Sequence, residues 1–225
     1  IIHHRGPDGE GTFVDKNAGI GSTRLAIIDL REIANMPLYD TEDRYVIVFN
    51  GEIFNYIEVR NELLQKGHKF STDSDTEVVL NAYKEWGEDC LHKLNGMWAI
   101  AIWDKKERSL FCSRDRYGIK PFYYYIDNEK LIFASEIKQI LARGADKSVN
   151  DEIIYDYLVF NFIDHTDSTF FKNITKLQAG HKFTVKDNKF KVSRWYNLPE
   201  ENTMTDTKNL YPDFYDLLYD SVRLR

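Results

Sequence analysis

The feature that most constrains the fold is a run of four short segments between Gly96 and Ala134. Residues 97–103, 109–113, 122–126 and 131–134 are rich in β-branched and aromatic side chains, and short polar stretches separate them. Such segments are typical of strands joined by tight turns. The pattern therefore predicts an antiparallel sheet.

The chain before this run alternates between the two kinds of secondary structure. Residues 44–49 form an apolar, β-branched run that leads into Asn50-Gly51, so we expect a strand that ends there in a tight turn. Apolar residues then recur at helical spacing until Gly67. This spacing predicts a first helix, whose apolar positions are Val59, Leu63 and Leu64.

A second helix is predicted from the sequence Ser74-Asp75-Thr76-Glu77, which has the pattern of a capping box, and Gly87 ends it. Its apolar face comprises Val78, Val79, Ala82, Tyr83 and Trp86. Strands, then helices, then more strands predict an α+β fold in which helices cover sheets.

The last part of the chain indicates a domain boundary. A strand pair is expected at residues 181–186 and 190–195, and it is followed by the polar, turn-rich residues 199–209. From Leu210 to Arg225, apolar residues lie at roughly helical intervals. We expect one domain over residues 1–198, a linker over 199–209, and the first helix of a next domain over 210–225.

Composition excludes several classes of partner. The 225 residues carry 36 acidic and 30 basic side chains without a basic stripe, so a nucleic-acid partner is not expected. No apolar run approaches the roughly 20 residues that span a bilayer, so no membrane partner is expected. The two cysteines, Cys90 and Cys112, favour buried thiols over a disulfide framework, which is typical of a cytoplasmic protein.

Six motifs occur in an order that resembles one family closely. The family is the class II glutamine amidotransferases, and specifically the glutamine-hydrolysing asparagine synthetases. The resemblance covers residues 4–141, and extends more weakly to Tyr196. The motifs are His4-Arg-Gly-Pro-Asp8, Ser22-Thr-Arg-Leu-Ala-Ile-Ile-Asp29, Phe49-Asn-Gly-Glu-Ile-Phe-Asn-Tyr56, Ser74-Asp-Thr-Glu77, Arg114-Asp-Arg-Tyr-Gly-Ile-Lys-Pro121 and Ala134-Ser-Glu-Ile-Lys138.

The resemblance implies a fold and a reaction. The fold is a four-layer αββα sandwich of antiparallel sheets, as in N-terminal-nucleophile hydrolases. The domain would hydrolyse glutamine to glutamate and ammonia, and a second, ATP-dependent domain would use the ammonia to amidate aspartate. ATP and Mg²⁺ are expected in that second domain, and no cofactor is expected in this one.

Glutamine hydrolysis requires hydrogen-bond donors for the tetrahedral oxyanion. The resemblance assigns this role to Asn50 and Gly51. Taken alone, the Asn-Gly pair would more simply be a turn that tolerates positive φ, and this alternative stays open.

Recognition of a free amino acid requires a cation for its α-carboxylate and carboxylates for its α-ammonium. By resemblance Arg24 holds the carboxylate, and Asp75 with the Glu52 region holds the ammonium. The same resemblance places Leu25, Ile27 and Ile28 in the pocket. The alternatives are a surface ion pair for Arg24 and favourable first-turn electrostatics for Asp75.

The nucleophile in this family is an N-terminal cysteine whose α-amine is the base. Ile1 cannot supply this chemistry, and Cys90 and Cys112 have no free amine. We therefore expect a chain of these residues to be inactive, and we expect a few dozen residues, the cysteine among them, to precede His4 in the natural protein.

Other charged residues suggest no catalytic centre. The six histidines have no metal-ligand spacing, so no metal site is expected. Arg114, Asp115 and Lys120 are interpreted as a network within a turn, with a surface for the second domain as the alternative. Two other functions remain open: amidation of a sugar carboxylate, and a non-catalytic module that binds glutamine or acts as a scaffold. A homodimer is also possible.

Overall fold

The computed structural model describes residues 1–198 and 210–225. Its largest sheet has six strands in the order β11-β10-β6-β5-β4-β3. The bounds are Lys189–Arg194 for β11, His181–Lys186 for β10, Ser109–Arg114 for β6, Gly96–Asp104 for β5, Tyr45–Ile53 for β4 and Leu38–Tyr39 for β3. All neighbouring strands in this sheet are antiparallel. This confirms the antiparallel arrangement expected for residues 97–113 and the strand pair expected at 181–195.

Smaller sheets pair the remaining strands. The strands β1 (Gly9–Val14) and β2 (Gly19–Arg24) form a hairpin, and β7 (Tyr123–Ile126) lies between β8 (Leu131–Ala134) and β9 (Ile174–Lys176). The four segments between Gly96 and Ala134 are therefore strands, but they divide between two sheets. The interface between these sheets is aromatic: Phe122 packs against Phe133 and Phe183 with ring centroids 5.7 and 5.6 Å apart.

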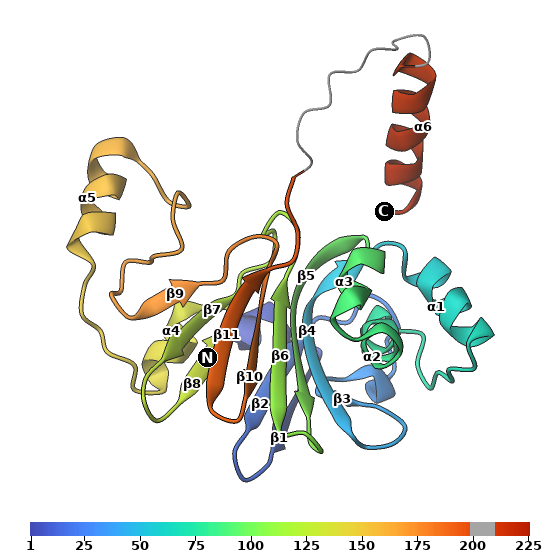
Figure 1. Ribbon diagram of the computed structural model, residues 1–225, viewed down its shortest axis with the longest axis horizontal. Coiled ribbons are helices and arrows are strands. Elements are labelled where there is room, and N and C mark those ends of the chain that lie inside the picture. The colour runs from blue at the N-terminus through green and yellow to red at the C-terminus, as the bar shows by residue number, and fades with distance from the viewer. Residues whose placement is uncertain (199–209) are drawn as a thin grey trace.

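Helices cover the outer faces of the sheets (Figure 1). The helices α1 (Tyr56–Gln65) and α2 (Asp75–Trp86) lie beside β4, with the short α3 (Cys90–Lys93) next to them, and α4 (Ile137–Ala142) packs against β7 and β8. Helix, sheet, sheet and helix thus form an α+β sandwich, as the sequence predicted.

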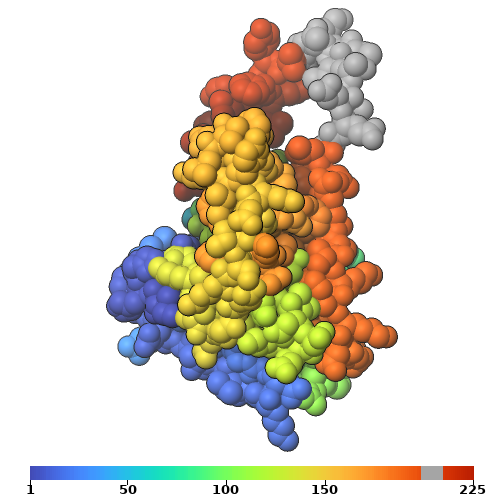
Figure 2. Space-filling model, turned by 90° about the vertical axis from the view of Figure 1, so that its left-hand side faces the viewer, coloured from blue at the N-terminus to red at the C-terminus, as the bar shows by residue number. Residues whose placement is uncertain are grey.

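The helix α5 (Asp151–Phe160) lies at the edge of this arrangement (Figure 1). In Figure 2 the gold segment that contains it stands out on the face turned to the viewer. Only Ile153 of this helix is buried, whereas Leu158 is 74% exposed. The helix therefore adds little to the core.

One predicted boundary is wrong, and it lies at the motif of greatest interest. Asn50 and Gly51 do not form a turn, because β4 continues through them to Ile53 and pairs residue by residue with β5. A Cβ atom on Gly51 would lie 2.2 Å from the carbonyl oxygen of Met97 and 2.8 Å from the Cα of Trp98. The absence of a side chain thus permits a close cross-strand approach, not a positive φ.

Both predicted helices are present, and so is a helix at the end of the chain. Ser74 caps α2 by accepting a hydrogen bond from the backbone of Glu77, at 3.3 Å. The capping box is incomplete, however, because the Glu77 carboxylate accepts from the backbone of Ser71 and Thr72. The helix α6 (Leu210–Arg223) is present, while the linker predicted at 199–209 falls outside the described residues. That α6 begins a further domain remains a prediction.

Candidate functional site

A pocket of about 350 Å³ opens between β2, β4 and the start of α2. Every residue that the sequence assigned to glutamine binding lines this pocket, although these residues come from three separate stretches of the chain. They are Arg24, Leu25, Ile27, Ile28, Asn50, Gly51, Glu52 and Asp75. The fold therefore brings the whole predicted set together.

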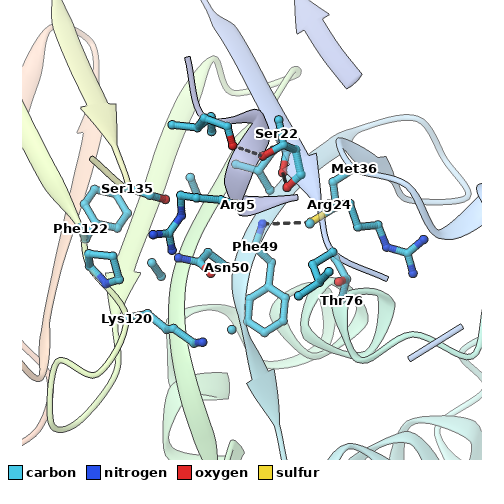
Figure 3. Close-up of a pocket in the computed structure, with 18 of the residues that line it drawn as sticks. Arg5, Ser22, Arg24, Met36, Phe49, Asn50, Thr76, Lys120, Phe122 and Ser135 are labelled. Atoms are coloured by element: carbon cyan, nitrogen blue, oxygen red, sulfur yellow. Dashed lines mark hydrogen bonds between the residues drawn. The ribbon is translucent and has the colours of Figure 1, made fainter. Parts of the chain in front are cut away.

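The strand β4 provides the centre of the pocket. Side chains two residues apart on a strand point to the same face, so Asn50 and Glu52 project on one side of the sheet. The Nδ2 of Asn50 is buried and has no hydrogen-bond partner within the described part of the chain. A buried amide donor without an acceptor costs about 1–3 kcal/mol. Asn50 lies among the residues that line the pocket (Figure 3), and its Nδ2 is an unpaired donor there.

Asp75 joins the start of α2 to the end of β4. It is the first residue of the helix, and its Oδ2 accepts a hydrogen bond from the backbone N–H of Ile53, at 3.0 Å. The side chain is buried, and burial raises the pKa of this carboxyl from 3.8 to about 6. The negative charge of Glu52 adds to the increase, whereas the Ile53 hydrogen bond opposes it. A carboxyl whose charge is disfavoured by burial and by a neighbouring carboxylate is a suitable partner for a cation.

Arg24 is buried and is not a surface ion pair, so that alternative reading is wrong. Its Nη1 donates to the carbonyl of Arg31 and to Oδ1 of Asn35, at 3.3 and 3.1 Å, and its Nη2 donates to the carbonyls of Ile28, at 2.9 Å, and Asp29. All four acceptors are uncharged. In Figure 3 the guanidinium extends past Met36, away from Asn50. Within residues 1–198 and 210–225, no carboxylate therefore neutralises the positive charge of Arg24.

The pocket also contains residues that the sequence analysis did not assign to it. Arg5 and Ser135 lie on the side of Asn50 opposite Arg24 in Figure 3, and Lys120 lies nearby. Arg5 donates to Glu136 at 3.3 Å, and Glu136 also contacts His4 at 3.0 Å. These residues belong to three of the six family motifs, so the sequence does mark them. Only the packing of the sheets, however, shows that they lie near Asn50.

The turn after β6 is the network that the sequence predicted. The Asp115 carboxylate is fully buried and accepts backbone hydrogen bonds from Tyr117, Ile119 and Lys120, each at 3.0 Å. Arg114 donates to the carbonyls of Gly118 and Lys120. These two side chains fix the backbone of the turn, and the turn places Lys120 at the pocket.

The cysteines lie away from the pocket. Cys90 in α3 and Cys112 in β6 are both buried, and neither lines the pocket. Burial raises the pKa of the Cys90 thiol to about 12 and raises that of Cys112 well above its usual value. Both groups are therefore protonated at neutral pH, and neither provides a thiolate.

The fold and the pocket together define an α+β protein that can receive a small polar ligand with a cationic group and an oxygen acceptor. A similar fold is found in the glutamine phosphoribosylpyrophosphate amidotransferase of Bacillus subtilis, solved with ADP and GMP. The TM-score is 0.55, and the match covers 79% of this chain and 35% of that chain. At 18% identity the likeness concerns the fold alone.

The sequence comparisons define the family. The chain belongs to the glutamine amidotransferase domain family, whose model matches residues 1–196. Curated relatives include asparagine synthetase [glutamine-hydrolyzing] 1 of Bacillus subtilis, 39% identical over 225 residues, and a putative asparagine synthetase [glutamine-hydrolyzing] 2 of Methanocaldococcus jannaschii, 38% identical over 247 residues. Both matches cover all of this chain, which spans 35% and 47% of those relatives.

Proposed function

We propose that this chain is the glutamine-binding part of an amidotransferase that makes asparagine. The observation that carries the proposal is the buried Nδ2 of Asn50, a donor without an acceptor in a pocket that also contains two carboxylates and a buried guanidinium. A glutamine side-chain oxygen, or the oxyanion that forms from it, would complete this donor's hydrogen bonding. The amide oxygen would thus lie against Asn50 and Gly51.

The α-ammonium of glutamine would lie between Glu52 and Asp75. The raised pKa of Asp75 supports this placement, because a bound cation relieves the repulsion that raises it. The α-carboxylate would lie toward Arg24, Leu25, Ile27 and Ile28. Arg24 attracts this group through its unneutralised charge, but a bidentate grip would require it to give up two of its four oxygen acceptors.

Bond cleavage by a thiolate would need a cysteine other than Cys90 and Cys112. Cys90 and Cys112 are buried and protonated, and neither lines the pocket. We therefore expect this chain to bind glutamine without releasing ammonia. By the family resemblance, the nucleophile would be an N-terminal cysteine, and ammonia would pass to an ATP- and Mg²⁺-dependent site that amidates aspartate.

The acceptor substrate, the cellular location and the oligomeric state do not follow from the pocket. The acceptor is taken as aspartate because the relatives named above are called asparagine synthetases; a sugar carboxylate is the alternative acceptor. A cytoplasmic location and a homodimer remain predictions. No helix in the described ranges has the length and apolar character needed to cross a bilayer.

Calorimetry tests the proposal. Titration of L-glutamine into the chain at pH 7.5 should give saturable binding, and the Asn50→Asp variant should bind at least about tenfold more weakly, because it replaces a donor by a third carboxylate. Absence of binding by the wild-type chain would favour a scaffold role. Ammonia release from glutamine by the same chain would contradict our assignment of the nucleophile.

A further inference from the structure

The wall of the pocket that contains Leu25, Ile27 and Ile28 is not held in place by apolar packing. These residues belong to the segment 25–31, which follows β2 and has no helix or strand. Leu25 and Ile27 are 56% and 69% exposed, and Leu30 is 76% exposed. Polar contacts must therefore determine the conformation of this segment.

Arg24 holds the segment from inside the protein. Its guanidinium donates to the carbonyls of Ile28, Asp29 and Arg31, as described above. At its beginning, the segment is also attached by Ala26, whose N–H donates to Oδ2 of Asp8 at 2.9 Å. These contacts attach the backbone of segment 25–31 to Arg24 and Asp8. They do not connect the segment to Glu52 or Asp75, the residues that would bind the α-ammonium.

Asp29 provides that connection from the other side. Its Oδ1 accepts from Nε of Arg31 at 2.7 Å, and its Oδ2 accepts from the backbone N–H of Asp73 at 2.7 Å. Arg31 in turn bridges to Oδ2 of Asp73 at 2.8 Å. Asp73 is two residues before Asp75, at the start of α2, so the Asp29 carboxylate joins the two halves of the proposed glutamine site.

The local conformation supports a specific role for Asp29. Its backbone has φ 54°, a left-handed conformation that non-glycine residues rarely adopt, and its side chain is only 2% exposed. Arg31 and Asp73 are 55% and 75% exposed, so their own ion pair contributes little. The hydrogen bonds to the Asp29 carboxylate are charge-assisted and join a side chain that is almost inaccessible, so they are the stronger contacts.

We propose that Asp29 is a positioning residue for glutamine, and that it fixes segment 25–31 against the start of α2 so that both ends of the amino acid are held at the correct separation. This inference rests on the proposed function. Asp29 does not line the pocket. It acts through Ile28, which does, and through Asp73, which precedes the lining residues Ser74 and Asp75.

Three variants and a control test the role. We expect Asp29→Ala to raise the dissociation constant for L-glutamine about tenfold or more, because a small displacement of binding groups is sufficient for such a loss. Asp29→Asn should have a smaller effect, because Asn tolerates positive φ and can still accept from Asp73. Arg31→Gln changes an exposed side chain and should also weaken binding.

The matched control is Asp43→Ala. Asp43 has φ 55°, almost the same as Asp29, and forms an ion pair with Lys105 at 2.6 Å, but it does not line the pocket. Both alanine variants therefore carry a similar backbone penalty. Asp29→Ala should lower the melting temperature more, because it also removes the hydrogen bonds of a side chain that is 2% exposed, against 74% for Asp43. Only Asp29→Ala should also change glutamine affinity, measured by calorimetry at a temperature where circular dichroism shows both to be folded.

The outcomes separate the inference from the function on which it rests. Wild-type affinity in folded Asp29→Ala, or an equal loss in Asp43→Ala, would overturn the positioning role. If Asp29→Ala does not fold, wild-type affinity in Arg31→Gln would overturn it. If the wild-type chain binds no glutamine, the proposed function fails. Hydrogen exchange then tests the connection, because Asp29→Ala removes the acceptor of the Asp73 N–H and should speed its exchange. An unchanged, slow exchange at this N–H in folded Asp29→Ala would refute the connection.

Discussion

Replacement of Asp75 by asparagine should separate stability from ligand recognition. Burial, with Glu52 nearby, raises the pKa of this carboxyl from 3.8 to about 6. Because the pKa is raised in the folded state, the protonated form contributes stability fully below about pH 4, and this contribution is lost as the pH rises through 6. The change corresponds to about 3 kcal/mol.

Asp75→Asn keeps an oxygen that can accept from the Ile53 N–H and removes the titration. The variant should equal the wild type in stability near pH 4 and exceed it by up to about 3 kcal/mol at pH 8, or roughly 6–12 °C in melting temperature. Urea unfolding at several pH values measures the difference. A variant less stable than the wild type at pH 8 would refute the reasoning, because it would mean that the ionised carboxylate stabilises the fold.

The same substitution should lower the affinity for glutamine, although it raises the stability of the fold. An α-ammonium favours the ionised form of Asp75, so wild-type binding should strengthen as the pH rises from 5 to 7, with release of a proton. Asp75→Asn should bind more weakly at pH 7.5 and lose most of this pH dependence between 5 and 7. Calorimetry in two buffers of different ionisation enthalpy detects the proton directly.

Further predictions concern other parts of the pocket and the core. Gly51→Ala should destabilise the fold by about 3 kcal/mol or more in urea unfolding, since its Cβ would lie 2.2 Å from the Met97 carbonyl, whereas Gly19→Ala, with nothing within 4 Å, should change stability little. Cys90 and Cys112 should resist a thiol reagent at pH 8 in the native protein and react in guanidinium, because burial raises both pKa values; reaction of the native protein would contradict this. Lys120→Ala should leave stability nearly unchanged in urea unfolding, since backbone groups of the turn, not this side chain, are bonded to Arg114 and Asp115; a large loss would refute that account.

The parts of the fold that the sequence predicted are those with strong local patterns. The strands of residues 97–113 and the helices beginning at Tyr56 and Asp75 combine clear periodicity with a recognisable start or end. The hairpin of β1 and β2 was missed because its glycine-rich strands, such as Gly19–Arg24, have little apolar alternation.

The wrong prediction at Asn50-Gly51 falls in the proposed binding site. A polar Asn-Gly-Glu sequence in a central strand contradicts local preference, so the local pattern predicts a turn. In the structure the polar side chains face the pocket, and Gly51 permits the approach of β5. Local sequence rules are expected to fail at binding sites, where residues are selected for a ligand more than for the strand.

A different limit applies to three arginine and lysine side chains. The sequence does not predict where Arg5 and Lys120 lie, or which groups Arg24 contacts. Each depends on contacts between segments distant in sequence, such as Arg5 with Glu136. The resemblance assigns Arg24 to glutamine binding, but it does not show that its guanidinium is bonded to the backbone carbonyls of Ile28, Asp29 and Arg31. Such arrangements follow from how the sheets and loops pack together.

A crystal structure of the chain with bound L-glutamine would test the central claim most directly. The account predicts that the side-chain oxygen lies within about 3 Å of Nδ2 of Asn50, and that the α-ammonium lies between Glu52 and Asp75. Glutamine bound outside the pocket, or bound with its ammonium at Asn50 and its amide at Asp75, would contradict the account.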